Sequence, residues 1–135
     1  YMVLGNAQWS TQEINTGATS KENGEFNTDK VHSVPNWENN YPAFRIIENL
    51  NSGNETGWYM PSISELDQLK LTMGDNSSYN TYYILSSTET SPSKVYQYCW
   101  HTRFASAGYS HIEALNKSLN ISYVVAFKKF NAFDE

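Results

Sequence analysis

Cysteine is nearly absent from this chain of 135 residues, in which Cys99 stands alone. A single thiol excludes an internal disulfide, a cysteine-rich zinc site and a paired-cysteine redox centre. Positive charge is also scarce, with 9 Lys and Arg against 14 Asp and Glu and a formal net charge of −5. Because nucleic-acid-binding domains normally carry the opposite balance, we expect no nucleic-acid partner.

Long apolar runs are missing as well. No stretch of 18 apolar residues occurs, so we expect no membrane insertion. The chain begins at Tyr1 without a leader, and we interpret it as a fragment of a longer exported precursor. Asn, Ser and Thr, which number 15, 16 and 10, predict a surface typical of exported proteins. We therefore expect an extracellular or cell-surface location, including display on an outer-membrane lipoprotein.

Aromatic residues are abundant. Ten Tyr, six Phe and four Trp make up 15% of the chain and supply a large area for burial. A folded chain of 15.4 kDa hides roughly 68% of its unfolded surface, which suffices for a core without a metal or a disulfide. We predict a single domain over residues 1–135.

Local patterns predict three helices. Capping residues at 27–29 begin a short helix that ends near Val34. Pro42 lies in the first turn of a second helix. Ser62 and Glu65 form a capping box at the start of a third helix.

Apolar and aromatic segments predict strands at 1–4, 57–60, 81–87, 95–104 and 122–130. Residues 10–30 have no hydrophobic period and predict a long surface loop. This order indicates an α+β fold with an antiparallel sheet. Within 95–104 the aromatic side chains alternate with polar ones, and we assign the aromatic face, which includes Trp100, to the core.

Four segments together resemble a known family. GWYMPSISEL (57–66), YYILSSTE (82–89), CWHTRFASAG (99–108) and YVVAFKKF (123–130) resemble the C-type-lectin-like domain of bacterial surface proteins. This family includes the Legionella collagen-like protein C-terminal domain and the Fibrobacter succinogenes major domain. The upstream segment NYPAF (40–44), with its helix, also resembles Bacteroides members of this group. Leu85 and Val125 depart from it, since the family has Trp and Arg there, and this weakens the case for an arginine-dependent site.

The resemblance implies a C-type-lectin-like fold, in which the first and last strands pair and two helices with long loops flank an antiparallel sheet. Such domains act mostly as surface recognition modules. We therefore expect a non-enzymatic module that binds a glycan or a partner or host protein. The alternative is a structural tip, cap or spacer domain of a larger cell-surface or fimbria-like assembly.

The predicted ligand-binding residues lie on the polar face of 95–104, in the following loop and in the Ser-Ser-Thr-Glu motif at 86–89. They are Gln97, His101, Arg103, Tyr109, His111 and Glu89. Such side chains suit glycan or protein recognition. The alternatives are an ordinary solvated strand face and, for the motif, side chains that satisfy backbone groups. Trp9 and Trp37 are either stacking surfaces or anchors of long loops.

Enzymatic and metal chemistry find little support. The chain has no HExxH, P-loop, GxGxxG or GxSxG motif. Cys99 and His101 would lie roughly 7 Å apart in a regular strand, too far for a hydrogen bond. Formylglycine-generating enzymes, which resemble this fold, use two cysteines. The proline loop at 91–93 lacks carboxylates for calcium. We expect no enzyme, no cofactor, no metal and calcium-independent binding.

Overall fold

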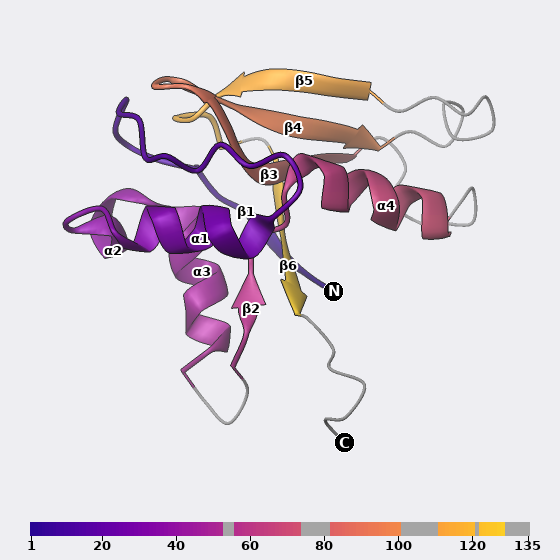
Figure 1. Ribbon diagram of the computed structural model, residues 1–135, viewed down its shortest axis with the longest axis horizontal. Helices are drawn as coiled ribbons and strands as arrows, with labels where there is room; N and C mark the ends of the chain where they lie inside the picture. The colour runs from indigo at the N-terminus through magenta and orange to yellow at the C-terminus, as the bar shows by residue number, and fades with distance from the viewer. Residues whose placement is uncertain (53–55, 74–81, 101–110, 121, 129–135) are drawn as a thin grey trace.

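The structure is a computed structural model, and it describes residues 1–52, 56–73, 82–100, 111–120 and 122–128 (Figure 1). The predicted α+β class is confirmed. The described ranges hold four helices, against three predicted from local patterns and two implied by the resemblance. In chain order the elements are β1 (Met2–Asn6), α1 (Gly24–His32), α2 (Trp37–Asn40), α3 (Pro42–Leu50), β2 (Trp58–Tyr59), α4 (Ile63–Met73), β3 (Tyr82–Ser91), β4 (Lys94–Trp100), β5 (His111–Asn116) and β6 (Tyr123–Lys128).

The strands form a mixed sheet in the order β1-β6-β3-β4-β5, and β2 also pairs with β6. β1 and β6 are antiparallel, with Met2 opposite Ala126, which confirms the predicted pairing of the first strand with the last one described. β3 and β6 run parallel at Ile84 and Tyr123, so the prediction of an antiparallel sheet is wrong. Residue alternation specifies the two faces of a strand but not its direction.

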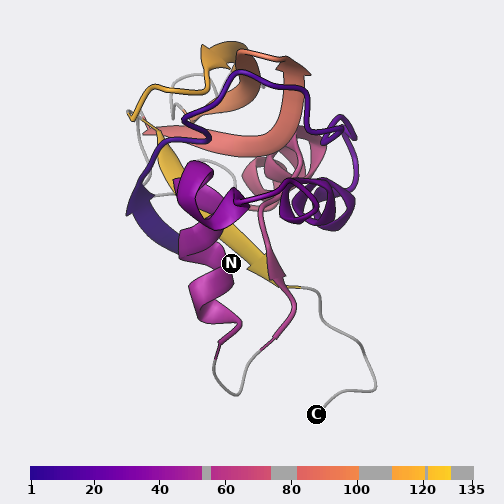
Figure 2. The same cartoon turned by 90° about the vertical axis from the view of Figure 1, so that its left-hand side faces the viewer.

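The sheet curves over the helices. In Figure 2, β3 and β4 arch above α1, and β1 lies beside β6. One core cluster packs Trp9, Tyr41, Phe44 and Ile47 with Val95. The Trp9 ring meets Phe44 edge-on at a centroid distance of 5.0 Å. Trp9 is therefore an anchor of the irregular N-terminal segment, and its alternative role as an exposed stacking surface is wrong.

A second cluster lies where α4 covers the sheet. It joins Ile63 and Leu66 of α4 to Ile84, Tyr98 and Val125 of the strands. Tyr98 is fully buried, as the predicted core face of β4 requires. Because Val95 on the other face is also fully buried, both faces of β4 are covered over this stretch.

The capping box at the start of α4 is confirmed. The Ser62 backbone N–H donates to Glu65 Oε1 at 3.0 Å, and the Glu65 N–H donates to Ser62 Oγ at 3.3 Å. The same carboxylate oxygen accepts the Gly24 N–H at 2.8 Å. A Cβ on Gly24 would clash with the Met60 carbonyl oxygen. This close approach favours glycine at position 24. α1 begins there, three residues before the predicted start, because Asn23 caps the helix: its Oδ1 accepts the Phe26 N–H at 3.0 Å.

β5 is an element that the sequence pattern did not predict. We expected Tyr109 and His111 in a loop, but His111 begins β5, which pairs antiparallel with β4 and places Gln97 opposite Glu113. Tyr109 lies outside the described residues. The longest helix of the described part is α4, with 11 residues, and no helix there combines the length and apolarity that a membrane span requires.

Candidate functional site

The structure does not gather the six predicted ligand-binding residues into one exposed patch. His101 and Arg103, like Tyr109, lie outside the described residues, and His111 is placed only as the first residue of β5. Gln97 is 3% exposed and Glu89 is 4% exposed. The polar face of β4 is therefore buried at Gln97, where we considered it as solvated.

Gln97 is held by neighbours on both sides. Its Oε1 accepts the Ser122 hydroxyl at 2.6 Å, and its Nε2 donates to Glu113 Oε2 at 3.2 Å. Burial of an amide is tolerated when its donors and acceptors have partners in the protein. Gln97 thus joins β4 to β5 and to the start of β6.

The Ser-Ser-Thr-Glu motif is a bulge in β3. Leu85 pairs with Gln97 and Glu89 pairs with Val95, so four steps along β3 match two along β4. A bulge leaves backbone groups unpaired and bends the strand. The Ser86 hydroxyl donates to a β4 carbonyl, that of Tyr96, at 2.8 Å.

The other motif side chains bind the segments that cross this bulge. Thr88 Oγ1 donates to the Ser20 carbonyl at 2.9 Å and accepts the Ile63 N–H at 3.1 Å. Asn27 Nδ2 donates to Ser87 Oγ at 3.0 Å. Of the two interpretations of the motif, satisfaction of backbone groups is therefore the one that the structure supports.

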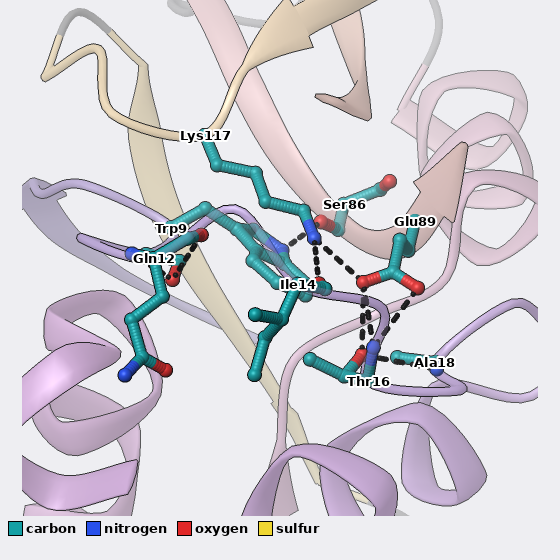
Figure 3. Close-up of polar contacts among 9 residues, drawn as sticks. Trp9, Gln12, Ile14, Thr16, Ala18, Ser86, Glu89 and Lys117 are labelled. Atoms are coloured by element: carbon teal, nitrogen blue, oxygen red, sulfur yellow. Dashed lines mark hydrogen bonds and ion pairs between the residues drawn. The ribbon is translucent and has the colours of Figure 1, made fainter. Parts of the chain in front are cut away.

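Glu89 forms a buried ion pair with Lys117, a residue that the sequence analysis did not single out (Figure 3). The Lys117 Nζ lies 2.6 Å from Glu89 Oε2, and both side chains are 1% exposed. The Thr16 N–H donates to Glu89 Oε2 at 3.0 Å, and Lys117 donates to the Ile14 carbonyl at 2.9 Å. Lys117 also lies over the Trp9 ring, 4.8 Å from its centroid.

Burial lowers the pKa of Lys117, and the hydrogen bond and charge of Glu89 oppose that shift. The pair connects β3, the turn after β5 and the irregular segment between β1 and α1. Since both charges are removed from water and satisfied within the protein, we assign this cluster a structural role.

A cleft of about 200 Å³ lies between α1, α3 and β2. Residues 25, 29 and 32 of α1 share one helix face by their spacing, and they turn a carboxylate, a second carboxylate and an imidazole toward the cleft. The last turn of α3 adds Glu48, and β2 adds Trp58. The cleft thus joins three acidic side chains to one indole.

Asn51 positions Trp58 at this cleft. Its Oδ1 accepts the Trp58 backbone N–H at 2.9 Å, and its Nδ2 donates to the Trp58 carbonyl at 3.0 Å. These two bonds satisfy the backbone N–H and carbonyl of Trp58, in a strand only two residues long. The Nδ2 also lies 3.2 Å from Glu48 Oε2, which ties the indole and this carboxylate to one amide.

His32 closes one side of the cleft. Its ring stacks on Trp37 at a centroid distance of 4.1 Å, and its Nε2 lies 3.7 Å from Glu48 Oε2. That nitrogen is buried and has no hydrogen-bond partner. Burial lowers the pKa of His32, and the charges of Glu48, Asp29 and Glu38 oppose the shift without reversing it. The imidazole is therefore mainly neutral at pH 7.

This cleft was not predicted from the sequence pattern. The expected start of α1 after Gly24 left Glu25 outside the helix, so its spacing to Asp29 and His32 was not recognised. That spacing was the available signal on α1. Nothing in the local pattern indicates that Glu48 and Trp58 lie opposite.

The described residues contain no group of three or more His, Cys, Asp or Glu side chains arranged to hold a metal ion. Comparison with protein-family models, with curated proteins and with solved structures finds no match to the chain.

Proposed function

We propose that this protein is a non-enzymatic recognition module that binds a glycan or a partner protein through the cleft between α1, α3 and β2. The observation that carries the proposal is the combination of the half-buried Trp58 indole with the carboxylates of Glu25, Asp29 and Glu48 around one open space. An apolar ring with a few convergent polar groups is the usual composition of a small-ligand site.

The resemblance to C-type-lectin-like domains of bacterial surface proteins supports this proposal, because such domains act mostly in recognition. The pairing of β1 with β6 agrees with the strand pairing of that family. We place the protein outside the cell or on its surface, on the strength of the same resemblance and of the composition rich in Asn, Ser and Thr.

Calcium-independent binding is part of the proposal. Calcium takes six to eight oxygen ligands, whereas the three carboxylates of the cleft do not form a cation-holding group within the described ranges. Binding would then rest on ring stacking and hydrogen bonds.

A structural role in a larger assembly is the second candidate. Its support is the exposure of apolar side chains on both edge strands, at Met2 in β1 and at Ile112 in β5. Edge strands with exposed apolar residues favour pairing with another chain. Sedimentation at increasing protein concentration tests this role, and a monomer throughout would contradict self-association through these edges.

Glycan and matrix-protein arrays test the recognition role. The unmodified protein and a Trp58→Ala variant are compared, with Tyr83→Ala as the control, because Tyr83 is an exposed aromatic residue on β3 outside the cleft lining. We expect signals that Trp58→Ala abolishes and that Tyr83→Ala leaves unchanged. The proposal would be contradicted if the folded protein gave no binding signal on either array, or if Trp58→Ala left the signals unchanged.

A further inference from the structure

The cleft is rich in hydrogen-bond acceptors. The carboxylates of Glu25, Asp29 and Glu48 line it, and an ionised carboxylate only accepts. The Tyr59 hydroxyl, also at the cleft, donates to Glu65 Oε2 at 2.8 Å and is thereby committed to the capping box. A ligand that carries several donors can pair with these carboxylates.

The charge of the cleft is negative. His32 does not offset the carboxylates at neutral pH, because its pKa is lowered by burial. A cleft lined with charge of one sign concentrates ions of the other sign. The ammonium of Lys128 lies 5.9 Å from the Trp58 ring centroid and is the protein's own positive charge beside this indole. The three carboxylates of the lining outnumber it, and they favour a positively charged ligand.

The size and the distribution of acceptors restrict the ligand further. At about 200 Å³ the cleft is smaller than the ~300–1,000 Å³ pockets that take drug-sized ligands, so it suits a single ring. Its carboxylates come from two helices, Glu25 and Asp29 from α1 and Glu48 from α3. A lysine side chain carries donors at one end only, whereas an amino sugar carries an ammonium and several hydroxyls around a ring.

We propose that the cleft binds a hexosamine unit with a free, protonated amino group. The Trp58 indole contacts the C–H face of the sugar ring, and Asp29 and Glu48 accept hydrogen bonds from the ammonium and the neighbouring hydroxyls. This inference rests on the proposed recognition function and specifies its ligand.

The test is a titration of ¹⁵N-labelled protein with a fully deacetylated glucosamine trimer, near neutral pH where the carboxylates are ionised. The N-acetylated trimer has the same ring and hydroxyls without the charge, and an Nα-acetyl-lysine amide has the ammonium without the ring. We expect the Trp58 indole signal to move with the glucosamine trimer, at an affinity at least about fivefold above either comparison ligand. If the acetylated trimer binds as tightly as the glucosamine trimer, the inference is overturned. If the lysine amide binds as tightly, the cleft recognises a peptide ammonium and not an amino sugar, and the inference is overturned as well.

Two conservative variants locate the contact. Asp29 is exposed on α1, and Glu48 lies on α3, so we expect Asp29→Asn and Glu48→Gln each to weaken glucosamine binding about three- to tenfold, as for charge-assisted bonds at partly exposed groups. Glu22→Gln changes the net charge equally at an exposed position outside the cleft lining, and it should leave the affinity unchanged. If both cleft variants weaken glucosamine binding less than twofold, or if Glu22→Gln weakens it as much as they do, the assignment of the contact to Asp29 and Glu48 is overturned.

The inference and the underlying function fail in different ways. If neutral glycans bind at Trp58 and the free amine adds nothing, the recognition function stands and the amino-sugar inference is overturned. If no array ligand binds and no titrated compound moves the Trp58 signal of the folded protein, both are overturned.

Discussion

Removal of the Lys117 charge is the sharpest test of the buried cluster. Lys117→Met keeps an unbranched side chain against Trp9 but leaves the Glu89 carboxylate, whose side chain is 1% exposed, without its cation. Breaking a buried ion pair from one side costs about 3–5 kcal/mol. The Thr16 N–H and hydroxyl continue to bind that carboxylate at 3.0 and 3.1 Å, so we expect a loss of about 3 kcal/mol, near the lower end of that range.

The Glu89→Gln variant removes the negative charge of the same ion pair. It leaves the Lys117 ammonium with the Ile14 carbonyl and the face of Trp9, and we expect a loss of about 3 kcal/mol again. The double variant leaves no unpaired charge in the interior. It should therefore be less destabilised than the sum of the single variants, by about 2 kcal/mol or more of coupling.

Urea unfolding monitored by tryptophan fluorescence measures these differences. Domains of this size are stable by about 5–15 kcal/mol, so a loss of about 3 kcal/mol moves the midpoint clearly while the slope stays constant. Lys94→Met is the matched control, because Lys94 is an exposed lysine at the start of β4, and it should stay within about 0.5 kcal/mol of the unmodified protein. A Lys117→Met loss below about 1 kcal/mol, or additive single variants, would refute the account of this pair.

Two further predictions concern the packing of α1 and the pH dependence of stability. Gly24→Ala places a methyl group against the Met60 carbonyl and the Glu65 carboxylate; we expect a loss of about 1–3 kcal/mol, and a melting temperature equal to that of the unmodified protein would contradict the close approach. Burial lowers the pKa of His32 in the folded protein below its ordinary value of 6.5. Between the lowered pKa and 6.5 the unfolded chain therefore binds more protons than the folded protein. The free energy of unfolding should fall as the pH falls through this window. A His32→Gln variant should lose that part of the slope in urea titrations at several pH values, and an unchanged slope would show that His32 is not its source.

Much of the secondary structure follows from local signals. Ser62 and Glu65 predict the start of α4 because a capping box satisfies helix-end N–H groups within four residues of chain. Pro42 predicts the start of α3 for a similar reason, since a proline at the first helical position loses no hydrogen bond. β1, β2, β3, β4 and β6 each overlap a predicted strand.

The candidate site, by contrast, did not follow from local signals. The polar pattern of 95–104 suggested a solvated binding face, yet Gln97 is buried because β5 and the start of β6 supply partners for its amide. Glu89 suggested a ligand-holding carboxylate, yet Lys117 from 28 residues away neutralises it in the interior. Alternation along one strand does not tell which other segments cover it.

What the sequence by itself determined is the α+β class, the starts of α3 and α4 and the positions of most strands, because those depend on residues near one another along the chain. Only the tertiary structure decided that β6 runs parallel to β3, that Glu89 meets Lys117, and that α1, α3 and β2 enclose an acidic cleft beside Trp58. Each of these joins residues far apart in sequence, and such contacts form only when the buried faces of all the elements are satisfied together.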